Sequence, residues 1–386
     1  MSFQMIPPVG PEISVKEVLK IILKSFQKTN QVLILNNFLF NRVKHHNFWH
    51  FNKARSAIQL SLEAASIKKP DKTEVLVSIY TCNSVLQCII NAGLKPIVYD
   101  VEISTLGSLS ESIEEKISDR TLAIIANGLY GIAIDILKIK KISEKKNIYL
   151  IEDASQNFLS VFENKLMGTT GDMNILSYGL SKPIHSIGGG SLICNNLELI
   201  PIIDDQYKKH NKFGVNDFLS SFKKLVLLPF VLNPYGFKIF TLFFNRFDFN
   251  SHEKITIKKI GKIQLCALVH ELNKIDSTNK IRNKNFIQLV EIINNKEDLK
   301  ALEFNFEDNN FLRLPVICSK ERKKWIYKIR SCGIWASDEI YQSTCSINSE
   351  NVNSFKNYTI IKDQLILVSI HPLISEKNLD KLTRIN

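Results

Sequence analysis

A lysine follows a serine by five residues (182 − 177 = 5) in the stretch SYGLSKPIHSIGGGSLIC, which spans residues 177–194. Ser177 closes the apolar run MNILS, and three glycines precede a second apolar run, SLIC. Both runs predict short buried strands. A lysine in the turn between such strands holds a primary amine in a partly dry setting, which favours a nucleophilic amine. A loop lysine is more often a solvated surface charge, so Lys182 alone does not decide between the two interpretations.

A carboxylate ends another apolar run nearby. NIYLIED ends in Glu152 and Asp153. An acid at the carboxyl end of a parallel strand lies where ligands collect, although Asp153 could equally cap a following helix. A carboxylate, a hydroxyl and a lysine on adjacent strand ends meet the needs of a pyridoxal phosphate (PLP) site. There the carboxylate keeps the ring nitrogen protonated, the lysine forms a Schiff base, and the hydroxyl holds the phosphate.

The elements that must position these groups alternate along the chain. Helical patterns cover residues 54–66, 83–93, 111–117 and 134–146, and strand patterns cover 74–79, 95–100, 121–126, 147–153, 173–178 and 191–194. This alternation predicts an α/β fold with a mainly parallel, doubly wound sheet and helices on both faces. We expect a large domain over residues 1–249, with an N-terminal arm and an apolar helical insertion near 218–249. A smaller α+β domain follows over residues 250–386.

The totals limit the partners and the compartment. The net charge of +12 favours anionic partners. The lysines are spread along the whole chain, however, so we expect no nucleic-acid stripe. Seven cysteines without a CxxC pair, and no secretory signal, indicate a reducing, cytoplasmic compartment.

The insertion at 218–249 has apolar runs too short for a membrane span, cut by Pro229 and Pro234. It suits an interfacial hairpin on a membrane. A buried or subunit-interface helix pair is the favoured alternative.

The chain resembles the DegT/DnrJ/StrS family of PLP-dependent sugar aminotransferases, which has fold type I. The segments that carry the resemblance follow the family's order and spacing: ARSAIQLSL, VLVSIYTC, AGLKPIVYDVE, GLYGIAIDI, YLIEDASQ, MGTTGDMNILSYGLSKP and GGGSLICNN. RLPVIC and VSIHPLISEKNLDKL resemble the family's small domain. The weakest stretch runs from about residue 200 to 260.

The resemblance assigns roles to six residues. Lys182 matches the Schiff-base lysine, and Asp153 matches the partner of the ring nitrogen. Gln156 matches the residue beside the cofactor's phenolic oxygen, and Ser177 matches the phosphate-binding serine. Arg55 and Ser56 begin the helix whose N-terminal amides face the phosphate, a suitable anion site because those amides are unpaired.

The resemblance also implies partners and a reaction. It implies a homodimer that moves an amino group from glutamate to a nucleotide-activated keto-sugar, in biosynthesis of cell-surface polysaccharide or related sugars. The family's dehydratase branch carries histidine in place of the lysine, so Lys182 argues against that branch.

Several positions depart from the family pattern. Cys82 stands where an aromatic ring often stacks on the cofactor, with Tyr80 as a candidate to compensate on the substrate side. Gly128 replaces a common histidine, Ile187 begins the segment that is usually Gly-Glu-Gly-Gly, and an expected asparagine near IKKIGKIQ is missing. These departures fit a divergent subgroup. They leave open a catalytically weakened or regulatory PLP-binding protein, and a peripheral membrane enzyme acting on a lipid-linked sugar.

Histidines offer two weaker candidates. His185, three residues beyond the lysine, is either an acid or base toward the substrate or a loop histidine satisfied by backbone. His46 and His50 have the i, i+4 spacing of metal ligands on a helix, but HHNFWHF offers no third ligand, so we assign them to packing and surface and predict no metal site.

Overall fold

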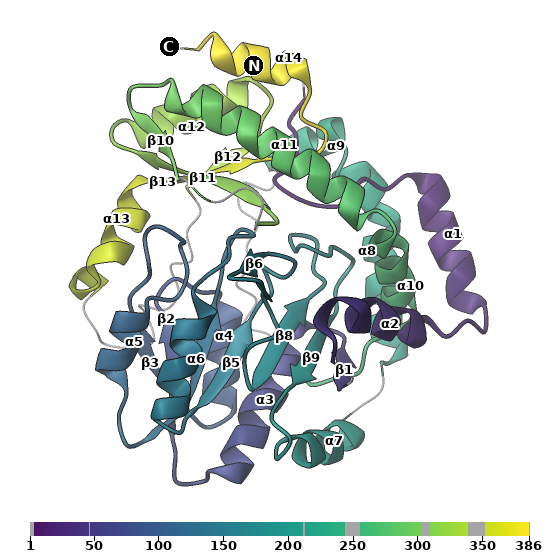
Figure 1. Cartoon of the computed structure of the whole chain (residues 1–386). Coiled ribbons are helices and arrows are strands. Elements are labelled where there is room, and N and C mark those ends of the chain that lie inside the picture. The colour runs from purple at the N-terminus through teal and green to yellow at the C-terminus, as the bar shows by residue number, and fades with distance from the viewer. Residues whose placement is uncertain are drawn as a thin grey trace.

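The computed structural model describes residues 4–45, 47–210, 213–243, 255–302, 304, 309–338 and 352–385. Figure 1 shows a large α/β body below a smaller body that contains β10–β13, with the long helix α11 lying across the upper part. The predicted α/β class is therefore confirmed.

The lower body is built on a seven-stranded sheet in the order β1-β9-β8-β5-β4-β2-β3. The strands from β8 to β3 in that order run parallel, whereas β9 is antiparallel to β8, and β1 is antiparallel to β9. The expected mainly parallel sheet is confirmed. The strand bounds are Phe48–Phe51 (β1), Glu74–Ser78 (β2), Lys95–Tyr99 (β3), Thr121–Asn127 (β4), Tyr149–Asp153 (β5), Met173–Ser177 (β8) and Gly190–Cys194 (β9).

Helices cover both faces of this sheet because consecutive apolar residues of a strand point to opposite sides. Val75 and Val77 of β2 pack with α3 (Ala54–Lys68), α4 (Asn83–Asn91) and α7 (Ile200–Lys209). Leu76, between them, packs on the other face. The helices of that face are α2 (Gln31–Val43), α5 (Ser110–Lys116), α6 (Ile136–Lys145) and α10 (Lys262–Leu272). A short hairpin of β6 (Val161–Phe162) and β7 (Lys165–Leu166) precedes β8.

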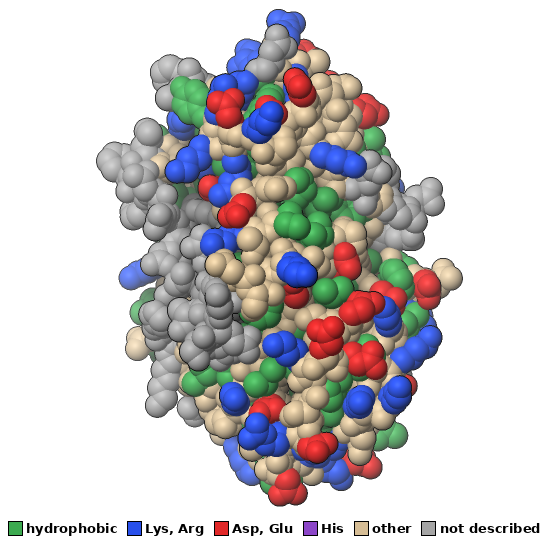
Figure 2. Space-filling view, turned by 90° about the vertical axis from the view of Figure 1, so that its left-hand side faces the viewer, with side chains coloured by type: hydrophobic (Ala, Val, Ile, Leu, Met, Phe, Trp, Pro, Cys, Tyr) green, Lys and Arg blue, Asp and Glu red, His purple; other side chains and the backbone are tan. Residues whose placement is uncertain are grey.

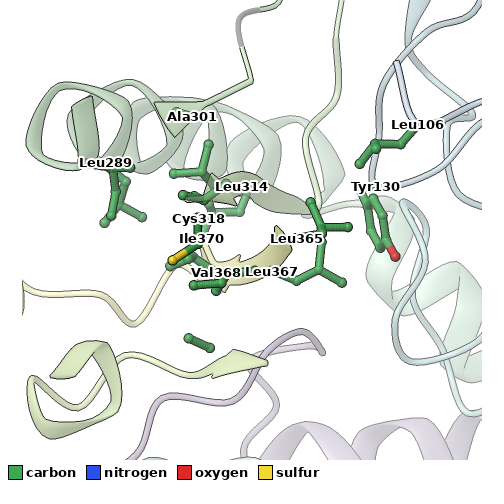
Figure 3. Packing of buried hydrophobic residues seen from close by; sticks show 14 of the residues in the cluster. Leu106, Tyr130, Leu289, Ala301, Leu314, Cys318, Leu365, Leu367, Val368 and Ile370 are labelled. Atoms are coloured by element: carbon green, nitrogen blue, oxygen red, sulfur yellow. The ribbon is translucent and has the colours of Figure 1, made fainter. Parts of the chain in front are cut away.

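The upper body has a four-stranded antiparallel sheet in the order β10-β11-β13-β12. Figure 3 shows its core, in which Leu289 of α11 packs toward Leu314 and Val368 of the sheet. Leu106 and Tyr130 of the large body join the same cluster, so the two bodies share a hydrophobic core. The bounds are Leu299–Ala301 (β10), Arg313–Cys318 (β11), Ala336–Ser337 (β12), Leu365–Ser369 (β13), Ile275–Asn294 (α11), Arg322–Ser331 (α12), Val352–Ser354 (η2), Lys356–Gln364 (α13) and Glu376–Thr383 (α14).

The N-terminal arm reaches the upper body before the chain enters the lower one. Ile6 bridges Ile334, and the Ser369 hydroxyl donates to the carbonyl of Pro7 at 2.9 Å. The chain then forms α1 (Val15–Phe26), which packs on α10.

The domain boundary near residue 249 stays a prediction, and the packing of α10 favours a later boundary. α10 lies beyond that boundary, yet its Leu265 and Leu268 share a core with Leu39 and Leu76 of the large body. We place the change of domain after α10, where α11 begins to pack on the small sheet.

The insertion forms a helical hairpin in its described part, as expected. α8 (Val215–Val231) and α9 (Pro234–Phe243) are joined at Asn233, whose amide donates to the carbonyls of Pro229 and Phe230 at 3.0 and 2.8 Å. Residues 244–249 of the predicted segment lie outside the described residues. Within the described ranges, every helix falls short of the length and hydropathy that a bilayer crossing requires.

The surface charges are mixed on the face that Figure 2 presents. On this side, which carries α5 and α13, basic and acidic side chains lie interspersed among the described residues rather than gathered by sign. This arrangement agrees with the expectation that the positive charge is diffuse.

Candidate active site

The sheet brings the predicted site residues to one edge. β5 ends at Asp153 and β8 ends at Ser177, and the two strands are parallel neighbours in which Asp153 pairs with Ile175. Residues 178–189 then form the loop that carries Lys182 before the chain returns along β9. The carboxylate, the hydroxyl and the amine therefore stand on adjacent strand ends.

Lys182 lies in a tight turn, with its amide donating to the carbonyl of Gly179 at 3.2 Å. Burial lowers the pKa of Lys182. Cys82 and Asp153 lie close enough to oppose this shift, and the positive charge of Arg313 adds to it. The lysine Nζ makes no hydrogen bond or ion pair with any residue that the structure describes. A lysine in this setting is shifted toward its neutral, nucleophilic form.

Asp153 is 8% exposed, and its Oδ1 accepts a hydrogen bond from the amide of Ser155 at 3.1 Å. The alternative that it caps a helix is wrong, because residues 155–159 form turns and no α-helix begins there. The negative charge of Asp153 opposes the lowering of the pKa of Lys182.

The backbone forms a cradle beside these side chains. A Cβ on Gly190 would lie 2.5 Å from the Cα of Ala54 and 2.7 Å from its nitrogen, so β9 passes directly against the first turn of α3. Gly188 and Gly189 have φ values of +137° and +124°, which side-chain-bearing residues rarely adopt. The N-cap of α3, Lys53, makes no capping hydrogen bond through its side chain. The helix N-terminus thus approaches the strand ends with its dipole favouring an anion.

Arg55 and Ser56 lie in this first turn, as predicted. Ser56 is fully buried, and its amide donates to the carbonyl of Lys53 at 3.1 Å. Ser177 is partly buried, and its Oγ lies 4.0 Å from the position of a Cβ on Gly179. That same position is 3.5 Å from the Cγ of Lys182, so the side chains of the serine and the lysine both approach Gly179.

Cys82 and Gln156 also lie at this edge. Cys82 precedes α4, accepts a hydrogen bond from the Ser84 hydroxyl at 3.2 Å and interacts electrostatically with Lys182. Gln156 is buried, and its Oε1 accepts from the amide of Tyr130 at 3.4 Å.

Tyr80 packs into the hydrophobic core beside the other candidates. Its side chain is fully buried, and its hydroxyl is 2.7 Å from that of Tyr130. Its ring packs 6.2 Å from that of Tyr358 in the core shared with the small domain. A contact between Tyr80 and a substrate stays a prediction that this packing does not favour.

His185 is held by side chains rather than by the backbone alone. Arg282 donates from Nη2 to His185 Nδ1 at 3.0 Å, and Nε2 lies 3.4 Å from Oε2 of Glu271. Because a guanidinium only donates, Nδ1 accepts and the proton of the neutral ring is on Nε2, directed at Glu271. Burial lowers the pKa of His185. With both nitrogens engaged, an acid or base role toward a substrate stays a prediction with little structural support.

The residues present fit PLP. A buried carboxylate stands beside a lysine that has no partner among the described residues, and a helix N-terminus without a side-chain cap faces the same strand ends. These are the three groups that the ring nitrogen, the aldehyde and the phosphate of PLP require.

The largest-scale alternative to this edge is a cavity elsewhere, since Lys182 does not line it and the described residues form no metal cluster. A cavity of about 560 Å³ lies between the N-terminal arm, α8, α10 and α11, and Lys182 is not among its lining residues. In the part of the chain that the structure describes, no three His, Cys, Asp or Glu side chains are grouped to hold a metal ion. His46 lies outside that part, and His50 is in a strand, not a helix.

Sequence reasoning missed residues that reach the site from distant segments. Arg313 begins β11, and its guanidinium carbon lies 5.9 Å from the centre of the Tyr130 ring. Arg282 and Glu271 hold His185 from α11 and α10. The sequence carries no local signal for these contacts, which join residues 86 to 183 positions apart.

The family model described as the DegT/DnrJ/EryC1/StrS aminotransferase family matches residues 22–384. Among curated proteins, the chain is 30% identical to the GDP-perosamine synthase of Vibrio cholerae over 36% of this chain and 38% of that protein. It is also 30% identical to the UDP-2-acetamido-2-deoxy-3-oxo-D-glucuronate aminotransferase of Pseudomonas aeruginosa, over 45% of this chain and 50% of that protein. These matches span half or less of the length of the relatives.

Solved structures share the fold over almost the whole chain. Helicobacter pylori PseC, an aminotransferase involved in the biosynthesis of pseudoaminic acid, has a TM-score of 0.74 at 16% identity, covering 98% of this chain and 97% of that one. The E. coli GDP-4-keto-6-deoxy-D-mannose-3-dehydratase with bound hydrated PLP also has a TM-score of 0.74, at 18% identity and 98% coverage of both chains.

Proposed function

Because the chain belongs to the DegT/DnrJ/EryC1/StrS aminotransferase family, we propose that it is a PLP-dependent aminotransferase. In this proposal it moves an amino group from glutamate to a keto-sugar carried by a nucleotide, in the biosynthesis of cell-surface polysaccharide or related sugars. The observation that carries it is the amine of Lys182, whose pKa burial lowers and which has no partner among the described residues, together with the buried carboxylate of Asp153 at the end of β5. The dehydratase branch is disfavoured by the same lysine.

When bound, PLP supplies an aldehyde that captures amines and a conjugated ring that accepts electrons from the carbon bearing the amine. Lys182 would hold it covalently and, in its neutral form, take the proton from the α-carbon of the donor. Asp153 would keep the ring nitrogen protonated. The amides at the start of α3 and the hydroxyl of Ser177 would bind the phosphate.

The test is a half-reaction followed by absorbance. The purified chain, loaded with PLP, is mixed with glutamate alone, and we expect the visible band of the bound cofactor to disappear as 2-oxoglutarate forms. A chain that binds PLP but leaves the band unchanged with glutamate and with other amino acids supports instead a regulatory or catalytically weakened protein, and contradicts the proposal.

We further propose a cytoplasmic homodimer. The six described cysteines are free thiols, which supports a reducing compartment. Light scattering after gel filtration tests the assembly, with a mass of twice 44.2 kDa expected. A monomer at micromolar concentration contradicts it.

A peripheral contact with a membrane is a second candidate, and the exposed residues of α8 and α9 favour it. Leu227 and Phe230 are 55% and 58% exposed, and Ile239 is 57% exposed. Leu23 and Phe26 of α1, which packs on α8, are 65% and 72% exposed. Lysines accompany these apolar side chains on α1 and α8. They are Lys16, Lys20 and Lys24 of α1, and Lys223 and Lys224 of α8. An anionic bilayer takes up exposed apolar side chains at its headgroup boundary, and its anionic lipids attract the flanking lysines.

Flotation with vesicles tests this contact. We expect the chain to float with vesicles that contain phosphatidylserine and to lose this when Leu227 and Phe230 are both changed to serine. The matched control makes the same change to serine at Ile67 and Ile90, which are 53% and 41% exposed on other helices. We expect this control to float like the wild type. Self-association that the Leu227 and Phe230 changes abolish without any lipid effect would show a protein interface instead.

A further inference from the structure

The cavity between the N-terminal arm, α8, α10 and α11 is acidic, although the chain carries a net charge of +12. Its volume of about 560 Å³ lies within the range of small-molecule sites, about 300–1,000 Å³. The carboxylates of Glu12, Glu17 and Glu271 line it, against the single amine of Lys274. Burial raises the pKa of Glu12, and the other two carboxylates add to the rise while Lys274 opposes it. The wall of the cavity therefore carries an excess of negative charge.

The lysine of this wall is already engaged. Nζ of Lys274 lies 2.5 Å from Oε1 of Glu17 and also donates to the backbone carbonyl of Glu12 at 3.2 Å. Nε2 of His270 lies 3.3 Å from the same oxygen of Glu17. Glu17 is thus matched by its neighbours. The side chains of Glu12 and Glu271 account for the excess charge.

Glu271 is 6% exposed and is only partly satisfied. Its Oε2 lies 3.4 Å from Nε2 of His185. In the part of the chain that the structure describes, its Oε1 is the one carboxylate oxygen that is buried without a hydrogen-bond donor. Nζ of Lys274 lies 3.8 Å from this atom, which is beyond hydrogen-bond distance. Arg282, which donates to His185, forms no ion pair with Glu271.

Other buried glutamates of the chain do have donors. Glu152 accepts from the amides of Gly168, Thr170 and Gly171, and Glu74 is paired with an arginine at 2.7 Å. A buried carboxylate oxygen that lacks a donor costs free energy, because it has lost water and gained no hydrogen bond. An N–H group bound in the cavity would offset this cost at Glu271.

The other lining residues select the kind of cation. Apolar side chains make up much of the wall: Leu228 and Leu232 of α8, Ile281 of α11, Leu373, and the prolines at 11, 229, 234 and 372. Among the described residues, no three His, Cys, Asp or Glu side chains are grouped to hold a metal ion. The carboxylates therefore suit an ammonium group, and the leucines suit an aliphatic chain attached to it.

We propose that this cavity binds an organic ammonium ion with a short aliphatic chain. The ammonium group donates an N–H to Oε1 of Glu271, a charge-assisted hydrogen bond, and Glu12 adds a second negative charge. The aliphatic chain lies against Leu228 and Leu232. This site is separate from the strand ends around Lys182, so it does not depend on the proposed aminotransferase function.

The experiment measures binding of N,N-dimethylhexylamine to the full-length, PLP-loaded chain by calorimetry, with hexan-1-ol as the uncharged match. This tertiary amine is protonated at neutral pH, carries an N–H and cannot condense with the aldehyde of PLP. The variants are Glu271→Gln and Glu12→Gln, each of which removes one negative charge. Glu74→Gln is the matched control, because Glu74 is also buried, at 4% exposure, and does not line the cavity.

We expect the wild type to bind the amine at least about tenfold more tightly than the alcohol, because only the amine forms the charge-assisted bond. Glu271→Gln should weaken the amine about 10- to 100-fold, and Glu12→Gln about 2- to 10-fold. Both should leave the alcohol unchanged. Glu74→Gln and Lys182→Ala should bind the amine like the wild type.

Equal affinity for the amine and the alcohol, or no measurable binding of the amine, overturns the inference. Wild-type affinity for the amine in both Glu271→Gln and Glu12→Gln overturns it as well, and the second variant decides if the first does not fold. Loss of the amine in Lys182→Ala would place it at the cofactor edge and contradict the inference. A wild-type chain that binds the amine but shows no half-reaction with glutamate supports this inference while the proposed function fails.

Discussion

Gly190 is the position where one added methyl group tests the phosphate cradle. A Cβ there would lie 2.5 Å from the Cα of Ala54, 2.7 Å from its nitrogen and 2.8 Å from the carbonyl oxygen of Leu176. Carbon atoms in contact are separated by about 3.5–4.0 Å. All three neighbours belong to the backbone, so no side-chain rotation relieves the overlap. In Gly190→Ala, the first turn of α3 must move away from β9 by about 1 Å.

This displacement predicts two measurable losses. Overpacking of this kind costs about 1–3 kcal/mol of the free energy of unfolding. Amide-to-phosphate hydrogen bonds are about 2.7–3.2 Å long, so a shift of about 1 Å breaks them. Each hydrogen bond to a charged group contributes about 1.5–3 kcal/mol. With a factor of ten for every 1.4 kcal/mol or so, loss of one such bond weakens PLP binding by about 10- to 100-fold.

The assay is a fluorescence titration of the PLP-free chain with PLP, together with urea unfolding of the same sample. Gly214→Ala is the matched control, because its nearest neighbour to an added Cβ is Asp217 Oδ2 at 3.4 Å and its φ is −92°. We expect the control to bind PLP like the wild type. Wild-type PLP affinity in Gly190→Ala would refute the assignment of this cradle to the phosphate, even if the chain were destabilised.

Three further predictions address the neighbouring residues. Asp153→Asn should reduce turnover by at least about 100-fold while changing the free energy of unfolding by about 1 kcal/mol or less, as measured by assay and urea titration. Glu152→Gln should cost about 2–4 kcal/mol of unfolding free energy, because the carboxylate accepts from the amides of Gly168, Thr170 and Gly171. Burial lowers the pKa of His50 from 6.5 to about 4, so its contribution to stability is present above pH 6.5 and is lost as the pH falls through 4. His50→Gln should therefore flatten the pH dependence of unfolding in that window by up to about 1.4 kcal/mol per pH unit, and an unchanged slope would contradict it.

The sheet and its helices could be predicted because local pattern determines them. Val75 and Val77 face one layer and Leu76 the other, which explains why the centre of this strand is apolar at consecutive positions. Because β5 and β8 are neighbouring parallel strands, their carboxyl ends bring Asp153 and Ser177 to the same edge of the sheet. Glu152 accepts hydrogen bonds from three backbone amides of residues 168–171, a role that its position at a strand end did not indicate.

The remaining features depend on contacts between distant segments. Tyr80 follows a strand end, like the other candidate residues, but its hydroxyl bonds to Tyr130, and its ring packs into the small-domain core. His185 lies close to Lys182 in sequence, yet Arg282 and Glu271 engage both of its nitrogens. The sequence indicates no partner for either side chain, because those partners are set by how the two domains pack.

The central claim is that Lys182 is the covalent anchor of PLP, and borohydride reduction tests it most directly. The purified chain is incubated with PLP, reduced, digested and analysed by mass spectrometry. We predict one phosphopyridoxyl group, located on Lys182, and none in Lys182→Ala, with loss of the visible band in that variant. A reduced adduct on another lysine, or one that forms equally in Lys182→Ala, would contradict the account.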